Sequence, residues 1–128
     1  MRILLDTQIA LWAWAEPARI PGHIKEAMTA LGNEVFFSQV STWEIQIKYD
    51  LGKLSMDSAP IKFVPTAIKR SGFLYQAIKD DALFFLGRLP GIHRDPFDRL
   101  LIAQAIVGDF KLATVDDKVL KYPVPIVE

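Results

Sequence analysis

Four acidic residues, Asp6, Glu44, Asp98 and Asp116, stand at or near points where apolar sequence passes into helix-like sequence. Carboxylates that gather in one place repel one another, so such a group either carries raised pKa values or is held together by a cation. Oxygen ligands suit a hard ion such as Mg²⁺, for which Mn²⁺ can substitute. An ion of this kind can activate water and stabilise the charge that develops on a phosphate during displacement. These residue types therefore favour metal-assisted phosphate chemistry, provided that the fold brings them together.

Each of these acids also has an ordinary structural explanation. Ser41-x-x-Glu44 matches a capping box, and Asp6 and Asp116 could be helix N-caps that stabilise by about 0.5–2 kcal/mol each. Residue by residue, capping is the more common role for such an acid. The pattern alone therefore leaves catalysis and capping both open.

The strongest local signal surrounds Asp98, where a charged turn leads into an apolar helix. Pro96 suits the first helical position, Asp95 suits the cap before it, and Asp98 then falls in the first turn, where a helix favours an anion. The segment 100–107 is almost wholly apolar, and Gly108 is a helix stop signal. We therefore expect a buried helix with a carboxylate at its start.

Short apolar stretches alternate with helical patterns along the whole chain. The expected strands are 2–5, 35–37, 111–115 and 124–127, with a weaker strand or extended link at 73–78, and the expected helices are 7–15, 22–31, 41–51, 59–71, 79–87, 96–107 and 116–121. This order predicts an α/β fold, a three-layer α/β/α sandwich with a central, mainly parallel sheet. Sites in such sheets form where strand carboxyl ends meet helix N-termini, which would collect the acids at one edge.

Bulk composition narrows the class of protein. A chain of 128 residues with 51% hydrophobic content suits one domain spanning 1–128. Cysteine is absent, which excludes disulfides and cysteine-based metal or redox chemistry. Fifteen basic and fifteen acidic residues balance, which argues against a nonspecific polyanion binder but permits a local basic patch. We expect no signal peptide and no membrane segment, and hence a cytoplasmic protein.

Several blocks of sequence together resemble a known family. They are Leu4-Leu5-Asp6-Thr7, then Ser41-Thr42-Trp43-Glu44-Ile45 with Lys48 and Leu51-Gly52-Lys53-Leu54, then the run from Asp95-Pro96-Phe97-Asp98-Arg99 to Ala105, and finally Thr114-Val115-Asp116. In order and spacing they resemble a PIN domain of the VapC toxin type. The resemblance implies a metal-dependent ribonuclease that cleaves RNA, belongs to a type II toxin-antitoxin pair and is held inactive by a cognate VapB antitoxin. It also implies a homodimer.

The same resemblance assigns roles to the acids. Asp6 and Asp98 would be the principal ligands of Mg²⁺, and Glu44 and Asp116 would complete the site directly or through water. The ion would activate water for attack on the RNA phosphodiester. One departure is Gln8, where many relatives carry a shorter polar side chain or His.

Threonines and basic residues near the acids complete the candidate site. Thr7 and Thr114 could hydrogen-bond neighbouring carboxylates and fix their orientation. Arg99, Lys48 and Arg94 are candidates for binding RNA phosphate, although screening the acids or lying in solvent explains them equally well or better.

The remaining aromatic and histidine residues point to no chemistry. His23 and His93 lie in no metal-ligand or triad pattern, so a general-base role is not expected. Trp12, Trp14 and Trp43 suit a core or an interface better than base stacking. The first helix is apolar nearly all round, which suggests that another chain covers one of its faces.

Two other functions remain open from the sequence. A catalytically silent PIN-fold module could bind RNA or a protein with the same acids and no turnover. An aspartyl-phosphate phosphotransferase of related topology would need an acid two residues after its nucleophile, and Gln8 at that position argues against it.

Overall fold

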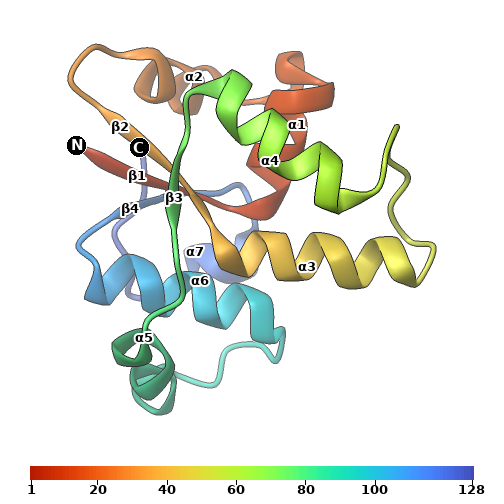
Figure 1. The fold of residues 1–128 in the computed structure, drawn as a ribbon. Coiled ribbons are helices and arrows are strands. Elements are labelled where there is room, and N and C mark those ends of the chain that lie inside the picture. Colours follow the sequence, from red (N-terminus) through yellow and green to blue (C-terminus); the bar gives the residue numbers. More distant parts are fainter.

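The computed structural model describes residues 1–128 and contains a four-stranded, wholly parallel sheet (Figure 1). The strands are β1 (Arg2–Leu5), β2 (Glu34–Ser38), β3 (Leu74–Gln76) and β4 (Lys111–Ala113). Their order across the sheet is β3-β2-β1-β4. The chain thus moves outward from β1 to β3 on one side and returns to place β4 on the other, which makes the carboxyl end of β1 a topological switch point.

Seven α-helices surround the sheet: α1 (Thr7–Ala15), α2 (Gly22–Thr29), α3 (Gln39–Asp50), α4 (Pro60–Ser71), α5 (Asp80–Phe85), α6 (Pro96–Val107) and α7 (Asp117–Leu120). Short 3-10 turns, Pro17–Arg19 and Leu86–Arg88, follow α1 and α5. In Figure 1, α1, α2 and α4 lie on one side of the sheet and α5, α6 and α7 on the other. The predicted three-layer α/β/α sandwich is confirmed.

Alternating side chains of the strands build two separate cores. Leu4, Phe36 and Leu112 join the core formed with α6, whereas Ile3, Val35 and their alternate neighbours join the core formed with α1, α2 and α4. This alternation follows from the two-residue period of a strand. Since both faces are covered, the middle positions of β1 and β2 are apolar on both faces rather than polar on one side.

Several predicted boundaries shift. Helix α3 begins at Gln39, not at residue 41, because Ser38 caps it by accepting a hydrogen bond from the backbone N–H of Val40 at 3.0 Å. The predicted capping box at Ser41 is therefore wrong. Helix α2 ends at Thr29, which leaves Leu31 outside it and fully exposed.

The end of the chain is also less regular than predicted. The expected strand 124–127 is reduced to a single parallel bridge between Ile126 and Leu112. The Lys111 strand ends at Ala113 rather than residue 115, because the chain turns there toward the cap of α7. No helix exceeds 12 residues, and none has the length and apolar character of a membrane-crossing segment.

Candidate active site

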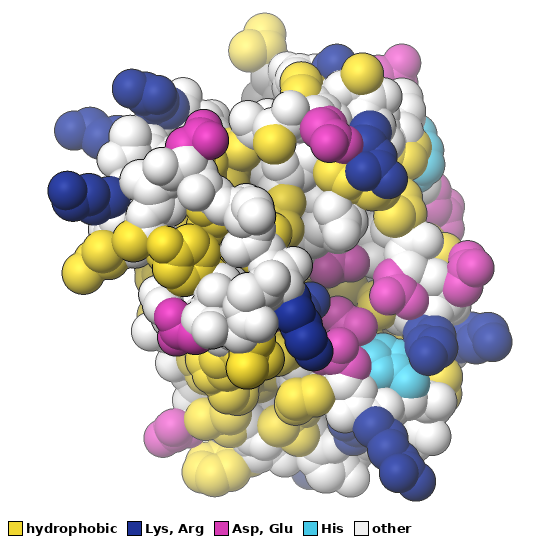
Figure 2. All heavy atoms as spheres, turned by 90° about the vertical axis from the view of Figure 1, so that its right-hand side faces the viewer, with side chains coloured by type: hydrophobic (Ala, Val, Ile, Leu, Met, Phe, Trp, Pro, Cys, Tyr) yellow, Lys and Arg dark blue, Asp and Glu magenta, His cyan; other side chains and the backbone are white.

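The four predicted acids line one pocket at the carboxyl edge of the sheet. Asp6 follows β1, Asp116 follows β4, Glu44 lies in α3 and Asp98 in the first turn of α6. The pocket has a volume of about 460 Å³ and also takes in Asp95. Figure 2 shows acidic side chains gathered around a hollow, with basic side chains beside it. The fold thus brings together residues that are up to 110 positions apart in the sequence.

Asp6 is buried, and the partner of its carboxylate is Thr114 rather than a backbone N–H of its own helix, α1. It occupies the N-cap position of α1, yet its side chain makes no capping hydrogen bond. Instead, Thr114 Oγ1 donates to Asp6 Oδ2 at 2.6 Å. Burial raises the pKa of Asp6 to about 6, the Thr114 hydrogen bond opposes the rise, and the charges of Glu44 and Asp116 add to it. Asp6 is therefore a positioned carboxylate with no cation beside it.

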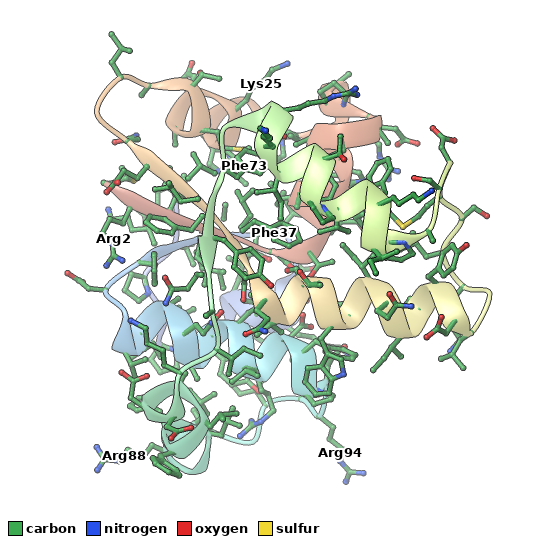
Figure 3. The ribbon with its side chains drawn as sticks, viewed as in Figure 1. Arg2, Lys25, Phe37, Phe73, Arg88 and Arg94 are labelled. Atoms are coloured by element: carbon green, nitrogen blue, oxygen red, sulfur yellow. The ribbon has the colours of Figure 1, made fainter.

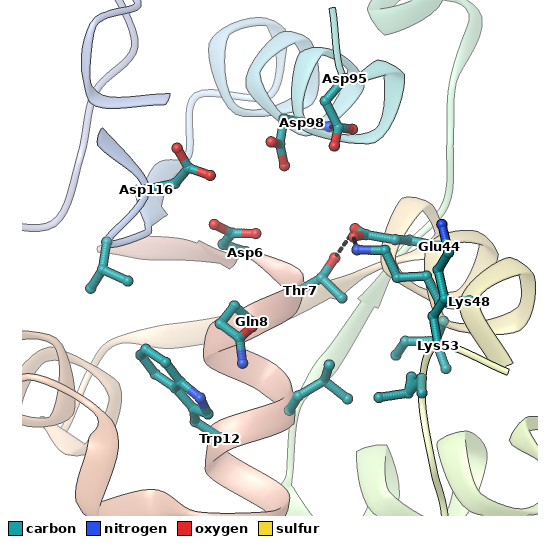
Figure 4. Close-up of a pocket in the computed structure, with 14 residues that line it drawn as sticks. Asp6, Thr7, Gln8, Trp12, Glu44, Lys48, Lys53, Asp95, Asp98 and Asp116 are labelled. Carbon is teal, nitrogen blue, oxygen red and sulfur yellow. Dashed lines mark hydrogen bonds and ion pairs between the residues drawn. The ribbon is translucent and has the colours of Figure 1, made fainter. Parts of the chain in front are cut away.

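Glu44 is fixed by a hydroxyl and a lysine. It lies in the second turn of α3, further into the helix than the sequence suggested, and only 6% of the residue is exposed. Thr7 Oγ1 donates to Glu44 Oε1 at 2.7 Å, and Lys48 Nζ binds Glu44 Oε2 (Figure 4). A hydrogen bond of 2.7 Å between the hydroxyls of Thr7 and Ser41 connects α1 to α3. Glu44 is thus the pocket carboxylate that already has a counter-ion.

Asp98 lies in the first turn of α6, but a different acid, Asp95, caps that helix. Asp95 Oδ1 accepts hydrogen bonds from the backbone N–H groups of Phe97 (2.9 Å) and Asp98 (3.1 Å), so Asp95 is the N-cap that the sequence predicts. The Asp98 carboxylate accepts no hydrogen bond and points into the pocket (Figure 4). Burial raises the pKa of Asp98 to about 7, and repulsion from Asp6 and the other acids adds to the rise.

Asp116 combines capping with a place in the pocket. Its Oδ1 accepts a hydrogen bond from the backbone N–H of Lys118 at 2.8 Å and so caps α7. Its own backbone N–H donates to Thr114 Oγ1 at 3.1 Å. Thr114 therefore ties Asp116 to Asp6, and capping does not remove Asp116 from the pocket.

The donor set of the pocket suits a hard divalent cation. The carboxylates of Asp6, Asp98 and Asp116 face a common space in Figure 4, and the raised pKa values of Asp6 and Asp98 reflect buried negative charge that lacks compensation. A cation would relieve that repulsion, and oxygen ligands favour Mg²⁺ or Mn²⁺. However, no three acid or histidine side chains converge closely enough to hold one ion together. A bound ion would therefore need water ligands or a closer approach of the carboxylates.

Comparison with known proteins agrees with this arrangement. Residues 3–124 match the PIN domain family. The chain belongs to the PIN domain family. PIN domains are generally nucleases and typically use divalent metal ions. No curated protein sequence matches the chain significantly.

Solved structures similar to this PIN domain include two VapBC complexes. The crystal structure of VapBC2 from Rickettsia felis, bound to a DNA fragment from their promoter, aligns with a TM-score of 0.74 at 20% identity and covers 100% of this chain and 98% of that chain. The structure of VapBC-1 from nontypeable Haemophilus influenzae aligns with a TM-score of 0.65 at 16% identity and covers 94% of this chain and 91% of that chain. At these identities the likeness establishes the fold, and the predicted PIN fold is confirmed.

The predicted basic residues do not all reach the pocket. Lys48 lines it, as does Lys53, which the sequence reasoning did not select. Arg99 instead donates to the carbonyl oxygens of Pro90 (2.9 Å) and Leu86 (3.1 Å), so its guanidinium anchors a loop. Arg94 points away from the body of the protein (Figure 3).

The three tryptophans are covered to different degrees within the chain. Trp14 stacks on Phe37 with ring centroids 5.2 Å apart, which is the expected core role. Trp12 lines the acidic pocket, and Trp43 is 45% exposed beside Phe97. Ile9 and Ala10 of α1 are buried within this chain, whereas Leu11 to Trp14 are only partly buried, so the expectation that another chain covers one face of α1 stays a prediction.

His93 is the residue whose place the sequence reasoning missed. Its side chain is buried, and Nε2 lies 3.5 Å from Asp98 Oδ2. No motif in the sequence signals this contact, because it depends on how the loop before α6 folds back. His23, by contrast, is exposed on α2.

Proposed function

We propose that this PIN domain is a metal-dependent endoribonuclease, the toxin of a type II toxin-antitoxin module, that hydrolyses RNA at the acidic pocket. The observation that carries the proposal is that the buried carboxylate of Asp6 and the largely buried carboxylate of Asp98 line one pocket without a counter-cation. Uncompensated charge of this kind is costly for a purely structural site and is suited to an ion.

Asp6, Asp98, Glu44 and Asp116 would hold the metal, and Mg²⁺ is the proposed ion, with Mn²⁺ able to substitute. When bound, the ion supplies activation of water and neutralisation of the charge that develops on the scissile phosphate. The protein contributes orientation: Thr114 fixes the rotamer of Asp6, and Thr7 fixes that of Glu44.

Lys48 and Lys53 are the cations nearest to the proposed reaction. Both line the pocket, so they can attract the RNA backbone to an opening that is otherwise acidic. The Lys48 side chain is 45% exposed while it binds Glu44, so a phosphate can approach it from solvent. We assign no substrate contact to Arg99 or Arg94.

An antitoxin of the VapB type is the proposed partner. Two solved structures with this fold are VapBC complexes, which supports the same pairing here. A homodimer is proposed from the family resemblance, and the partly buried apolar side chains of α1 are compatible with it.

The proposal is tested with antitoxin-free protein and a defined RNA. Cleavage is expected with Mg²⁺ or Mn²⁺, and it should disappear with EDTA and in Asp98→Asn. Activity that survives both the chelator and the substitution would refute the metal mechanism. RNA binding with no turnover, even at high Mn²⁺ and excess protein, would instead identify a catalytically silent binding module.

The toxin assignment needs a cellular test. Expression in a bacterial host should arrest growth, and co-expression of the adjacent reading frame should relieve the arrest. Mapping the cut RNA ends would identify the substrate. Cleavage in vitro without growth arrest would indicate a nuclease that is not a toxin.

A further inference from the structure

His93 lies in the loop before α6, and two contacts hold its side chain. Its side chain is 8% exposed, and its Nδ1 accepts a hydrogen bond from the backbone N–H of Asp95 at 3.0 Å. The phenol ring of Tyr122 packs against the imidazole at a centroid distance of 5.7 Å and an angle of 87°. The ring is therefore fixed in position by the backbone at the start of α6 and by Tyr122.

The hydrogen bond from Asp95 determines which nitrogen of a neutral His93 carries the proton. A ring nitrogen that accepts a hydrogen bond has no hydrogen of its own, so the proton lies on Nε2. Nε2 is buried, has no hydrogen-bond partner and lies 3.5 Å from Asp98 Oδ2. An unsatisfied buried donor is unfavourable, and here it faces a carboxylate.

Asp98 is the pocket acid that needs such a donor. Asp6 has Thr114, Glu44 has Thr7 and Lys48, and Asp116 caps α7, whereas the Asp98 carboxylate accepts no hydrogen bond. Carboxylates that bind metals are ordinarily oriented by such hydrogen bonds. Donor–acceptor distances at catalytic groups are also often long before ligands bind and shorten in the complex.

We propose that His93 is a positioning residue: its Nε2–H donates to Asp98 Oδ2 and sets the orientation in which that carboxylate meets a divalent cation. The proposal rests on the metal-dependent function proposed above. This hydrogen bond gives the buried Nε2–H of His93 a partner, and it gives the Asp98 carboxylate a group that orients it.

The surrounding loop explains how His93 keeps this position. The backbone N–H of His93 donates to the Tyr122 hydroxyl at 3.1 Å, and Arg99 donates to the same hydroxyl at 3.2 Å. Arg99 also binds two carbonyl oxygens of the loop. Arg99, one residue beyond Asp98, therefore stabilises the loop that presents His93 to Asp98.

The two nitrogens of His93 can be tested separately. His93→Asn retains an acceptor for the N–H of Asp95, since Asn readily bonds to the backbone two residues onward, but it has no donor at the Nε2 position. His93→Gln carries an amide N–H group that reaches that position. His23→Asn is the matched control, because His23 is exposed and is the other histidine of the chain.

The first measurement is histidine ¹⁵N NMR on the metal-free protein. We expect His93 as the Nε2–H tautomer, with its Nε2 signals shifted by Asp98→Asn and those of His23 unchanged. The second is calorimetric titration with Mn²⁺. His93→Asn should weaken Mn²⁺ binding about tenfold or more, His93→Gln should recover it to within about threefold of wild type, and His23→Asn should have no effect.

The outcomes separate this role from the proposed function. An Nδ1–H tautomer, or equal Mn²⁺ affinity in His93→Asn and His93→Gln, would overturn the role of His93 even if the wild-type protein binds Mn²⁺ and cleaves RNA. If the wild-type protein binds no Mn²⁺, the metal-dependent function fails and the role of His93 fails with it. Should His93→Asn fail to fold, the tautomer in the wild-type protein and its response to Asp98→Asn decide the question.

Discussion

Thr114 Oγ1 donates a hydrogen bond of 2.6 Å to Asp6 Oδ2, which joins residues 108 positions apart at the ends of two neighbouring strands. The same hydroxyl oxygen accepts the backbone N–H of Asp116. A single threonine therefore fixes the distance between the end of β1 and the start of α7. Because this hydrogen bond lowers the pKa of Asp6 while burial raises it, Thr114 also favours the ionised form of that carboxylate.

Thr114→Val should remove this support while keeping the side-chain shape. We expect the free energy of unfolding to fall by about 1–3 kcal/mol, because a buried carboxylate loses its partner. We also expect Mn²⁺ binding to weaken about tenfold, measured by calorimetric titration. Thr114→Ser retains the hydroxyl and should behave like wild type in Mn²⁺ binding. Equal Mn²⁺ affinity in the Val and Ser variants would show that the hydrogen bond does not orient Asp6 for an ion.

Asp98→Asn should separate stability from activity. The Asp98 carboxylate makes no capping hydrogen bond, and burial and the neighbouring acids raise its pKa. The charged form of Asp98 therefore destabilises the metal-free fold. Removing that charge should stabilise the metal-free protein by about 1–2 kcal/mol, a figure already reduced for solvent screening. RNA cleavage should be abolished. Urea unfolding in EDTA and a cleavage assay provide the two measurements.

Asp95→Asn is the matched control for Asp98→Asn. Asp95 caps α6 through its side-chain oxygen, and Asn caps comparably, so this variant should keep both the fold and most of the cleavage activity. A variant of Asp98 that unfolds would mean that this acid is structural rather than catalytic.

The pH dependence of stability should run opposite to that of ordinary ion-paired acids. The pKa values of Asp6 and Asp98, about 6 and about 7, both lie above the ordinary value of 3.8 expected in the unfolded chain. Between pH about 4 and about 6–7 the folded state binds more protons than the unfolded state. The stability that these two groups contribute is therefore fully present below pH about 4 and is lost as the pH rises through about 6–7. Between pH 5 and 8, the metal-free protein should therefore lose roughly 1–3 kcal/mol from these groups.

Chemical unfolding in EDTA at pH 5, 6.5 and 8 measures this effect. Asp98→Asn should flatten the dependence, because one of the two titrating groups is gone. Mn²⁺ at pH 8 should restore stability, since an ion that binds only the folded state stabilises it by mass action. A metal-free protein that is more stable at pH 8 than at pH 5, with the same slope in the variant, would contradict the raised pKa values.

Much of the fold can be predicted from local sequence, because the spacing of apolar residues identifies the strands and helices and the capping residues mark the helix ends. The Asp95-Pro96 start of α6 is read correctly, since the cap bonds only to groups two and three residues away. The start of α3 is not, because Ser38 and Ser41 both suit a cap and only the end of β2 decides between them. Local signals therefore locate helices better than they choose between competing caps.

The sequence predicts only those parts of the site whose positions follow from the order of the strands and helices. A parallel sheet brings the ends of β1, β2 and β4 to one edge, which places Asp6, Asp116 and the helix that carries Glu44 at the pocket. Asp98 reaches the same pocket from the start of α6. Contacts made by irregular loops are different, because no periodicity describes them. His93 approaches Asp98, and Arg99 turns toward Pro90 and Leu86, through the path of residues 86–95.

Lys48→Gln should affect metal and RNA in opposite directions. Lys48 is one of two lysines that line a pocket with five acids, and it pairs with Glu44. Burial lowers the pKa of Lys48, but the bond to Glu44 and the charges of nearby acids outweigh it and leave the pKa raised, so the side chain is a stable cation. Without this cation the pocket becomes more negative. Mn²⁺ should therefore bind severalfold more tightly, whereas RNA should bind more weakly.

RNA affinity is best measured in the Asp98→Asn background, where the substrate is not consumed. Lys48→Gln should weaken RNA binding at every sequence tested and reduce the slope of log affinity against log salt by about 1, as expected when one phosphate contact is lost. Lys48→Arg keeps the charge and should preserve the slope. If Lys48→Gln tightens Mn²⁺ binding but leaves RNA affinity and the salt slope unchanged, then Lys48 only neutralises Glu44, and Lys53 becomes the pocket residue to test for contact with the phosphate backbone.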